Sequence, residues 1–306
     1  MKVLVTGGAG FIGSHIVERL LREKCEIVVV DDLSTGSRDN LPEEVKLVEM
    51  DIRDAALRGV VANGKFDALI HLAAQTKVPL SLQYPDEDCS VNVMGLVNVL
   101  EACRLGGVRR VLFPSTAAVY GDVGELPVLE TARTEPASFY GLSKLVGERY
   151  LALYHQCYGM ETIIFRYANV YGERQGDSGE GGVVSIFSRK LAENEALKIF
   201  GDGSQTRDFI YVGDVAEANW LGLNTAVGHG IYNISTQSEV SVNELLAQME
   251  SVSGVAATRE YCAIREGDIY RSCLSHAAAK DALSWQPKTT LAEGLAKTYA
   301  ALAGKG

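Results

Sequence analysis

The sequence predicts an α/β fold built on a doubly wound parallel sheet, with a smaller mixed α/β region toward the C-terminus. Short apolar runs alternate with amphipathic stretches through the first half of the chain, which is the rhythm of strands followed by crossover helices. Several of these runs are apolar at nearly every position, as in parallel strands that are covered on both faces. The rhythm changes after about residue 167, where a glycine-rich segment follows.

Six strands and three long helices are predicted between residues 2 and 166. The strands are Lys2–Thr6, Glu26–Asp31, Val45–Glu49, Ala68–Leu72, Arg110–Pro114 and Thr162–Arg166. The helices are Gly10–Arg22, Val91–Leu105 and Ser138–Cys157. Farther on, the glycine-rich segment Gly172–Gly182 precedes a helix near Val183–Glu193 and a cluster of turn residues at Gly201–Ser204. We therefore expect a sheet domain over residues 1–170, with a later return segment near 207–225, and a second domain, mainly residues 171–306, that forms one wall of a cleft.

Length and composition limit the classes of protein that fit. At 306 residues the chain is longer than one hydrophobic core usually serves, which favours two domains. Hydrophobic residues make up 47% and charged residues 22%, as in soluble globular proteins, and no apolar run is long enough to span a bilayer. A net charge of −10 without a Lys/Arg cluster argues against a nucleic-acid partner.

The six cysteines and five histidines are scattered along the chain. They form no C-x-x-C pair and no other metal-ligand spacing, so we expect no metal and reduced, structural thiols. The chain enters its first predicted strand at Lys2, which leaves no room for a signal peptide. The expectation is a cytoplasmic protein that binds neither a membrane nor nucleic acid.

The turn after the first strand carries the pattern of a dinucleotide site. Residues 6–13 fit G-x-x-G-x-x-G through Gly7, Gly10 and Gly13, and G-x-G-x-x-G when Gly8 replaces Gly7. Glycine there allows the tight turn and the close approach of a pyrophosphate, which the helix N-terminus attracts. A glycine turn with no ligand is the structural alternative. The strand before it, the helix after it and Asp31 roughly 20 residues on favour a Rossmann unit.

Acidic residues at the strand ends point to the kind of dinucleotide. Asp31 and Asp32 would repel a 2′-phosphate, and no arginine follows directly, so NAD is favoured over NADP. Asp51, after the third strand, either accepts a hydrogen bond from the adenine amino group or caps the turn that follows, and the sequence favours neither.

Tyr140 and Lys144 are one helical turn apart, so their side chains share a face. A free phenol has a pKa of about 10, and a neighbouring ammonium together with a positive nicotinamide favours its ionised form. A Y-x-x-x-K pair alone is common on solvated helix surfaces, and the dinucleotide unit upstream makes it a catalytic candidate. Ser115 and Thr116 follow the fifth strand, where a hydroxyl can bridge substrate and Tyr140, cap the next segment, or do both.

A series of motifs then resembles a known family. In chain order they are GGAGFIG, DDLSTG, HLAAQ, STAAVYG, YGLSK, FRYANVYG and GDGSQTRDFIYVGDVA. Together they are similar to the extended short-chain dehydrogenase/reductases and, within them, to the UDP-glucose 4-epimerase group. The likeness continues through Arg265–Asp268 to Trp285–Lys288. It implies NAD as cofactor, a UDP-sugar as substrate and a homodimer formed through the helices predicted at Val91–Leu105 and Ser138–Cys157.

The resemblance also implies a reaction. Tyr140 would take the proton of the sugar 4-hydroxyl, directly or through Thr116, while Lys144 holds the nicotinamide ribose. Dehydratases and decarboxylases on this scaffold carry acidic residues where this chain has Ala117 and Ala118. Oxidation at C4, rotation of the 4-keto sugar and return of the hydride, which is epimerisation, is therefore the expected outcome. The alternatives are another nucleotide-sugar enzyme of the family (a uronate epimerase, decarboxylase or reductase) and a non-enzymatic NAD sensor.

Further site residues are carried over from the matching motifs. For the cofactor they are Gly7, Gly10, Phe11, Ile12, Gly13, Asp31, Asp32, Ser34, Gly36, Asp51, Ile52, Leu72, Ala73, Ala74, Asn92, Tyr140, Lys144, Tyr167 and Val170. For the substrate they are Ser115, Thr116, Asn169, Val183, Phe200, Arg207, Arg265 and Asp268. The two arginines suit a diphosphate, because guanidinium presents a fixed fork of donors. Without the motifs, Arg207 beside Asp208 would be read as a surface ion pair.

Two positions depart from the family pattern. Pro114 stands where relatives have a small polar residue, and it removes a backbone donor near the nicotinamide. Ser272 stands where some epimerases have a large aromatic residue that limits the sugar pocket. The smaller side chain would leave space for an N-acetyl group, and hence for UDP-GlcNAc and UDP-GalNAc, unless Tyr270 and Arg271 fill it.

Overall fold

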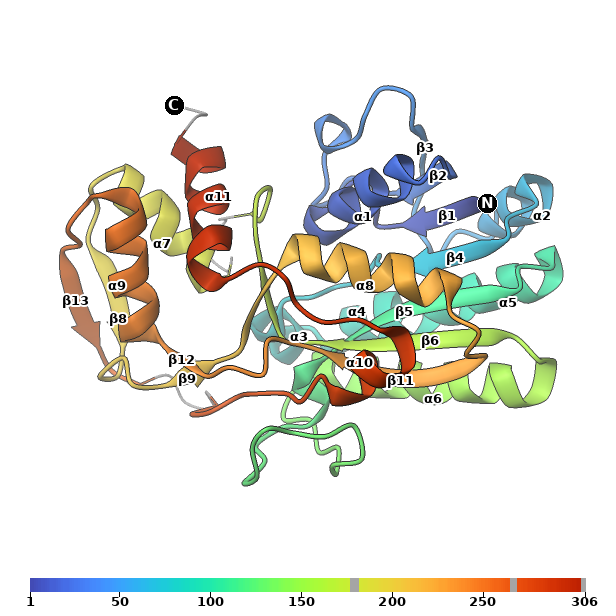
Figure 1. Ribbon diagram of the computed structural model, residues 1–306. Coiled ribbons are helices and arrows are strands. Elements are labelled where there is room, and N and C mark those ends of the chain that lie inside the picture. Colours follow the sequence, from blue (N-terminus) through green and yellow to red (C-terminus); the bar gives the residue numbers. More distant parts are fainter. Residues whose placement is uncertain (177–181, 265–268, 304–306) are drawn as a thin grey trace.

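The computed structural model describes residues 1–176, 182–264 and 269–303, and Figure 1 shows two lobes. The larger lobe, on the right, is a sheet with helices on both sides. The smaller lobe, on the left, holds α7 (Val183–Ala192), α9 (Val242–Ser253) and α11 (Leu291–Ala303). Among the described helices, none combines the length and the hydropathy that crossing a membrane requires.

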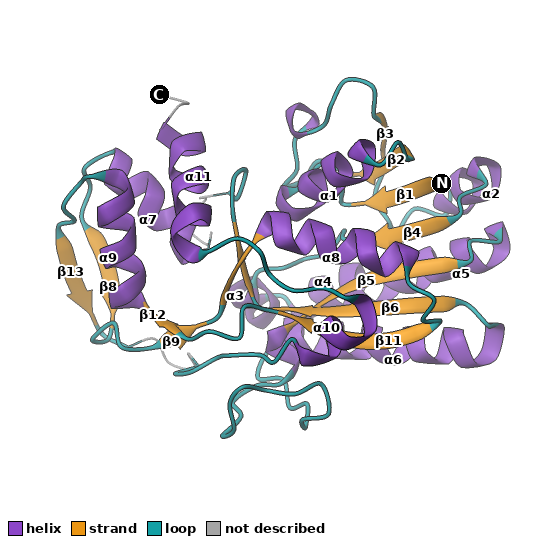
Figure 2. Ribbon diagram, viewed as in Figure 1, coloured by secondary structure: helices purple, strands orange, loops and turns teal. Residues whose placement is uncertain are grey.

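Seven parallel strands make the large sheet (Figure 2), in the order β11-β6-β5-β4-β1-β2-β3. Their bounds are β1 (Lys2–Thr6), β2 (Glu26–Asp31), β3 (Lys46–Glu49), β4 (Ala68–His71), β5 (Arg110–Thr116), β6 (Glu161–Tyr167) and β11 (His229–Ile234). The doubly wound parallel sheet and its six predicted strands are confirmed, and β11 is an addition. The strand order reverses between β1 and β4, and ligands of such sheets bind at the carboxyl ends near this reversal.

Helices cover both faces of the sheet, which explains why its strands are apolar throughout. In β1, Val3 and Val5 enter the core under α1 (Phe11–Arg22) and α8 (Val212–Asn224), while Leu4 enters the opposite core. That second core lies under α2 (Leu57–Gly64), α5 (Leu96–Gly106) and α6 (Phe139–Tyr158). Full burial of a side chain such as Leu4 contributes about 2 kcal/mol.

The helix predicted at Val91–Leu105 is not uniformly α-helical. The short helices α3 (Val78–Gln83) and α4 (Pro85–Cys89) lead into a π-helical segment, η2 (Ser90–Gly95), and only then does α5 begin. The wider turn of η2 places Asn92 inward, where its side chain is buried. Such π-helical turns occur frequently at functional sites.

The small lobe has its own core and its own short strands. The strand β8 (Leu197–Phe200) packs in this core with α7 and α9, and the mostly exposed β13 (Arg259–Cys262) pairs with it in parallel. Two more short pairs join the lobes: β7 (Asn169–Tyr171) with β10 (Phe209–Tyr211), and β9 (Thr206–Arg207) with β12 (Val240–Ser241). The remaining elements are α10 (Ala277–Leu283) and the 3-10 turns η1 (Arg38–Asn40) and η3 (Ala117–Val119).

The chain passes between the lobes more than once. After β8 it returns to the sheet through α8, which packs on α1, and the return continues beyond residue 225 because β11 pairs with β6. The chain then goes back to the small lobe for α9, and α10 packs against β11 before α11. The sheet is therefore completed by residues from the second half of the chain.

Candidate active site

The glycine turn has the geometry of a phosphate cradle. Gly7 has φ +68°, and a Cβ there would lie 2.5 Å from the backbone nitrogen of Ala73. A Cβ at Gly13 would overlap the Gly7 carbonyl oxygen. Gly10 stands at the N-cap of α1, and in the described part of the chain no side chain caps the N–H groups of its first turn, those of Phe11 and Ile12 among them. These groups and the helix dipole suit a pyrophosphate, so the turn fits NAD.

Asp31, at the end of β2, and Asp32, directly after it, are held in place by hydrogen bonds from the neighbouring backbone and from Ser34. The Asp31 carboxylate accepts from Ala9 N and Leu33 N, each at 2.9 Å. Burial raises the pKa of Asp31, and these two hydrogen bonds oppose the rise. Asp32 accepts from the backbone and the hydroxyl of Ser34 at 3.0 and 2.6 Å. The pair is thus fixed beside the glycine turn, at the place expected for the adenosine ribose.

Asp51 caps the turn that follows β3. Its Oδ1 accepts from Arg53 N at 2.7 Å, and its Oδ2 lies 2.6 Å from Arg53 Nη2. These interactions with Arg53 lower the pKa of Asp51. The capping interpretation of Asp51 is therefore observed, and Ile52 beside it is buried in the core under α2 and α5.

The segment after β4 runs directly against the glycine turn. The backbone nitrogens of Leu72 and Ala73 donate to Thr6 O at 2.9 and 3.1 Å, and Ala74 follows them. His71, at the end of β4, is buried, with Nδ1 2.8 Å from Thr6 Oγ1. Burial, together with a smaller effect of the Lys144 charge, lowers the pKa of His71 to about 3, so its imidazole is neutral at physiological pH.

Tyr140 and Thr116 meet at the carboxyl end of β5. Ser138 caps α6 by accepting from Gly141 N at 3.1 Å, which places Tyr140 in the first turn of the helix. Burial raises the pKa of the Tyr140 phenol to about 12, and a hydrogen bond with Thr116 lowers it. Thr116 Oγ1 also accepts from Ala118 N at 3.2 Å, so this hydroxyl both caps η3 and contacts the phenol.

Lys144 lies one turn along α6 from Tyr140 and is only 4% exposed. Its Nζ donates to the carbonyl oxygen of Pro114 at 3.0 Å and stands 4.8 Å from the ring centre of Phe113. Burial lowers the pKa of Lys144 to about 8, and the charge of Asp88 raises it. The register of β5 with β6 continues unbroken through Pro114, so the proline supplies an acceptor for Lys144 without disturbing the strand.

The Ser115 hydroxyl is bonded to a buried carboxylate of α6. It donates to Glu148 Oε1 at 2.5 Å, whereas the next residue, Thr116, is the one bonded to Tyr140. Arg166 on β6 holds the same carboxylate with two nitrogens, at 2.9 and 2.6 Å, and its Nη1 donates to Tyr120 Oη at 2.9 Å. Tyr120 in turn donates to Asn233 Oδ1 on β11 at 2.7 Å. A buried ion pair therefore fixes the strand end that carries Thr116.

The sequence reasoning missed this ion pair, although one signal was present. Glu148 follows Lys144 by four residues and Tyr140 by eight, so all three lie on one face of α6. A glutamate on the buried face of a helix needs a partner. The identity of that partner, Arg166, depends on the packing of α6 against β6.

Asn92 contacts protein groups on every side of its amide. Its Oδ1 accepts from Gln75 N at 2.9 Å, and its Nδ2 lies 2.9 Å from Gln75 O, 3.2 Å from Asp88 Oδ1 and 3.1 Å from Ser143 Oγ. The residue thereby joins η2, the loop after β4 and the first turn of α6. In this structure Asn92 organises the cofactor side of the site.

The last two residues predicted for the cofactor, Tyr167 and Val170, lie on β6 and β7. The residues expected for the substrate come from both lobes, and Asn169 is exposed at the start of β7. Val183 begins α7, Phe200 ends β8, and Arg207 is half-buried on β9. Arg265 and Asp268 lie outside the described residues.

Asp208 is not part of a surface ion pair. It is fully buried and accepts from Thr236 N and Oγ1 at 2.8 and 2.7 Å, from Gln237 N at 3.1 Å and from Leu274 N at 3.2 Å. Burial raises its pKa and these donors oppose the rise. Asp208 therefore ties three chain segments together beside Arg207.

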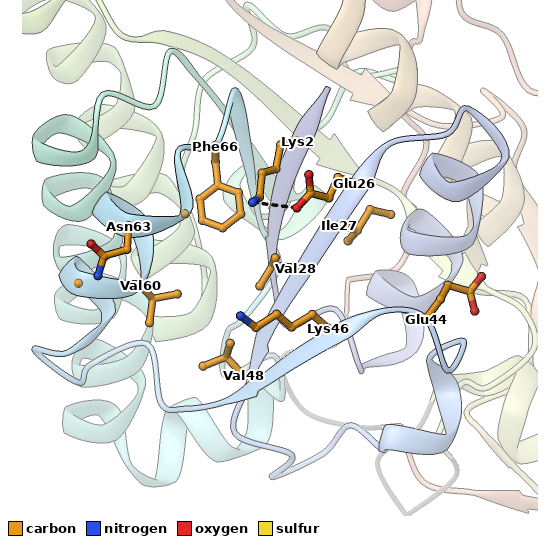
Figure 3. Close-up of a pocket in the computed structure, with 12 residues that line it drawn as sticks. Lys2, Glu26, Ile27, Val28, Glu44, Lys46, Val48, Val60, Asn63 and Phe66 are labelled. Carbon is orange, nitrogen blue, oxygen red and sulfur yellow. Dashed lines mark ion pairs between the residues drawn. The ribbon is translucent and has the colours of Figure 1, made fainter.

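A separate hollow lies near the amino ends of the strands, at the end of the sheet opposite to the glycine turn (Figure 3). It has a volume of about 630 Å³, and Lys2 and Glu26 pair across it at 2.8 Å. Its walls come from the amino ends of β1, β2 and β3 and from α2. Among its described lining residues there is none of the predicted site residues, and ligands of parallel sheets bind at the carboxyl edge. The candidate site is therefore at the carboxyl ends of the strands, where the glycine turn, Thr116 and Tyr140 lie.

Comparison with known proteins defines the class of this chain. Residues 3–235 match the NAD dependent epimerase/dehydratase family, and the chain belongs to that family. A curated relative, the putative UDP-glucose 4-epimerase of Methanocaldococcus jannaschii, is 45% identical over 96% of this chain and 95% of its own length.

Solved structures agree with this family. A UDP-glucose 4-epimerase from Thermotoga maritima, with UDP-glucose, has a TM-score of 0.97 at 37% identity and covers 100% of this chain and 99% of that one. A UDP-N-acetylglucosamine 4-epimerase from Methanobrevibacter ruminantium, in complex with UDP-N-acetylmuramic acid, has a TM-score of 0.95 at 32% identity, with 100% and 99% covered.

Proposed function

We propose that this chain catalyses the NAD-dependent 4-epimerisation of a UDP-hexose and interconverts UDP-glucose and UDP-galactose. The observation that carries the proposal is the meeting of Tyr140, Thr116 and Lys144 at the carboxyl edge of the sheet, beside the glycine cradle. The next two residues, Ala117 and Ala118, supply no acid for elimination or decarboxylation. The relatives named above support the same reaction.

Each residue of the trio has a role in this reaction. NAD⁺ bound at the cradle supplies the hydride acceptor, and in its reduced form the donor, for carbon C4. Tyr140 takes the proton of the 4-hydroxyl, directly or through Thr116 Oγ1, as C4 loses its hydride. Lys144 holds the nicotinamide ribose and favours the phenolate. The 4-keto sugar then rotates, and Tyr140 returns the proton when the hydride reaches the other face.

The test is a set of incubations without added cofactor. Purified protein is mixed separately with UDP-galactose, UDP-GalNAc and UDP-galacturonate, and the products are identified by NMR. Conversion of UDP-galactose to UDP-glucose is expected, because the cofactor is regenerated in each cycle. Conversion of UDP-galacturonate alone would favour the uronate epimerase, loss of CO₂ the decarboxylase, and a need for added NADPH the reductase.

We further propose that N-acetylated UDP-sugars are accepted. Ser272 is half-buried, and its two large neighbours are held by other groups: Tyr270 Oη lies 2.6 Å from Ser204 Oγ, and Arg271 Nε donates to Glu239 at 2.8 Å. The N-acetylglucosamine epimerase named above supports the proposal. UDP-GlcNAc turnover more than a hundredfold below UDP-glucose turnover would contradict it.

The protein is also proposed to be a homodimer. Large apolar side chains are exposed along η2, α5 and α6: Met94, Leu105, Leu142, Tyr150 and Leu153. Two antiparallel copies of this helix pair would bury them against each other.

The remaining proposals concern organisation and location. We assign residues 1–170 with the return segment mainly to NAD, and residues 171–306 mainly to the nucleotide-sugar, because the candidate ligand groups divide in that way. A cytoplasmic location is supported by the six cysteines, all among the described residues and all free thiols. Fractionation of cells expressing the protein tests the location.

A further inference from the structure

Asp88 is a buried carboxylate to which the proposed reaction gives no role. It lies on α4 and is 1% exposed. Its Oδ1 accepts from Gln75 Nε2 at 2.8 Å and from Asn92 Nδ2 at 3.2 Å. Both donors are neutral amides, so these two hydrogen bonds leave the charge of the carboxylate uncompensated. A buried charge of this kind is costly in free energy unless the charge of another group compensates it.

Asp88 is linked to the catalytic helix through two side chains. The Asn92 amide that contacts Asp88 also lies 3.1 Å from Ser143 Oγ, and this hydroxyl donates to the carbonyl oxygen of Tyr140 at 3.0 Å. Ser143 directly precedes Lys144, and α4 packs against α6. The carboxylate is therefore two hydrogen bonds from the turn that carries both Tyr140 and Lys144.

The other groups around Tyr140 and Lys144 are either neutral or already paired with an opposite charge. From β4, His71 is neutral and stacks on Phe113 with ring centres 6.1 Å apart. From β5 come the Pro114 carbonyl and the Thr116 hydroxyl. The other nearby acids have partners of their own: Glu148 on α6 pairs with Arg166, and Glu87 on α4 pairs with Arg53; Lys77 follows Gln75 on the loop after β4.

The charge of Asp88 acts on both members of the pair. Burial raises the pKa of Tyr140 to about 12 and lowers that of Lys144 to about 8, and the negative charge of Asp88 raises the pKa of each. A positive nicotinamide near Lys144 places two like charges in a region of low dielectric constant, where they repel strongly.

We propose that Asp88 is a positioning residue of the reaction, an internal counter-charge that keeps the Lys144 ammonium and the first turn of α6 in place when positive NAD⁺ binds. The role rests on the functions proposed above for Tyr140 and Lys144. Asp88 acts through Asn92 and Ser143, the two side chains that link it to the first turn of α6.

Asp88→Asn separates the charge from the hydrogen bonds. Both amide donors converge on Oδ1, so the single carbonyl oxygen of an asparagine can accept both, and only the charge is lost. The titration of Tyr140 is followed by tyrosinate absorbance in the NAD-bound protein, as the difference from Tyr140→Phe. We expect its midpoint to fall by about 1 pH unit, and the pH profile of kcat/KM to move in the same direction.

Matched variants complete the test. Asp86→Asn removes the same charge from an exposed position on α4 and is expected to leave the midpoint unchanged. Asp88→Glu retains the charge and is expected to keep the wild-type midpoint. If Asp88→Asn does not fold, Asp88→Ser removes the same charge in less space and is expected to give the same shift.

The outcomes distinguish this proposal from the proposed function. An unchanged midpoint in the charge-removing variants overturns the role of Asp88, even if the enzyme epimerises UDP-galactose. A shifted midpoint in a protein that converts no UDP-sugar supports Asp88 and overturns the proposed function.

Discussion

Burial and the negative charge of Asp88 oppose ionisation of the Tyr140 phenol, and the hydrogen bond with Thr116 favours it by lowering the pKa. In the protein without cofactor, burial dominates and raises the pKa to about 12. In the proposed mechanism a bound nicotinamide would add a positive charge next to Lys144 and favour the phenolate. Cofactor binding would then prepare the base, and catalysis would depend on the phenolic oxygen itself.

Tyr140→Phe is accordingly expected to lower kcat for UDP-galactose by about 10³-fold while NAD still copurifies, because the ring remains and the proton acceptor is lost. Steady-state kinetics and the absorbance of released cofactor measure the two effects. Tyr158→Phe, an exposed tyrosine of the same helix, is the control and is expected to retain full activity. Retained activity in the Tyr140 variant would remove it as the base.

The lowered pKa of the buried His71 imidazole predicts that the protein loses stability in acid. The folded protein keeps this imidazole neutral down to about pH 3, whereas the unfolded chain takes up a proton near pH 6.5. Its contribution is therefore complete above pH 6.5 and is lost as the pH falls toward 3. Between pH 7 and pH 4.5 the wild type is expected to lose about 3 kcal/mol more than His71→Gln, measured by urea unfolding. Equal losses in both proteins would contradict this assignment.

At the scale of elements, the Glu148–Arg166 pair joins α6 to β6 in the core below the site. Glu148→Gln leaves a buried guanidinium without its counter-charge, so the free energy of unfolding is expected to fall by about 3–5 kcal/mol. Glu26→Gln breaks the exposed pair with Lys2 and is expected to cost less than about 1 kcal/mol. The free energy of unfolding of both variants is measured by urea unfolding. Similar losses in the two variants would show that burial does not make the Glu148–Arg166 pair contribute more to stability than the exposed pair.

The elements that the sequence predicted are those whose signal is local. Lys2–Thr6 and Ala68–Leu72 are apolar at nearly every position because both of their faces are covered, and this requires no knowledge of their neighbours. β11 was missed because its first half is only partly buried and its place at the sheet edge is set by pairing with β6, 67 residues earlier at His229 and Thr162.

The same distinction applies to the site. Spacing alone placed Tyr140 and Lys144 on one helix face and Gly7 and Gly13 in one turn. Spacing also places Glu148 on that helix face, but it does not identify the partners of Glu148 or Asp88, which come from other elements: Arg166 from β6, and Gln75 from the loop after β4. Their roles follow only when α4, α6 and the sheet are packed together.

At the scale of the whole molecule, the exposed apolar side chains on η2, α5 and α6 form the surface that the proposed dimer would bury. Leu153→Asp places a charge in its middle and is expected to give a monomer in light scattering coupled to size exclusion, where the wild type is a dimer. Leu129→Asp changes a similarly exposed leucine on a loop and is expected to leave the dimer intact. A monomeric wild type would contradict the dimer proposal.

The position of β11 also affects how the protein is made. The last strand of the large sheet is residues 229–234, and Asn233 on it accepts from Tyr120, the partner of Arg166. Until the ribosome has released residues 229–234, β6 remains an unpaired edge strand, and such edges promote aggregation. The nascent protein therefore has to wait for more than two thirds of its length before the cofactor sheet can close, and chaperones that shield strand edges should associate with it during that interval.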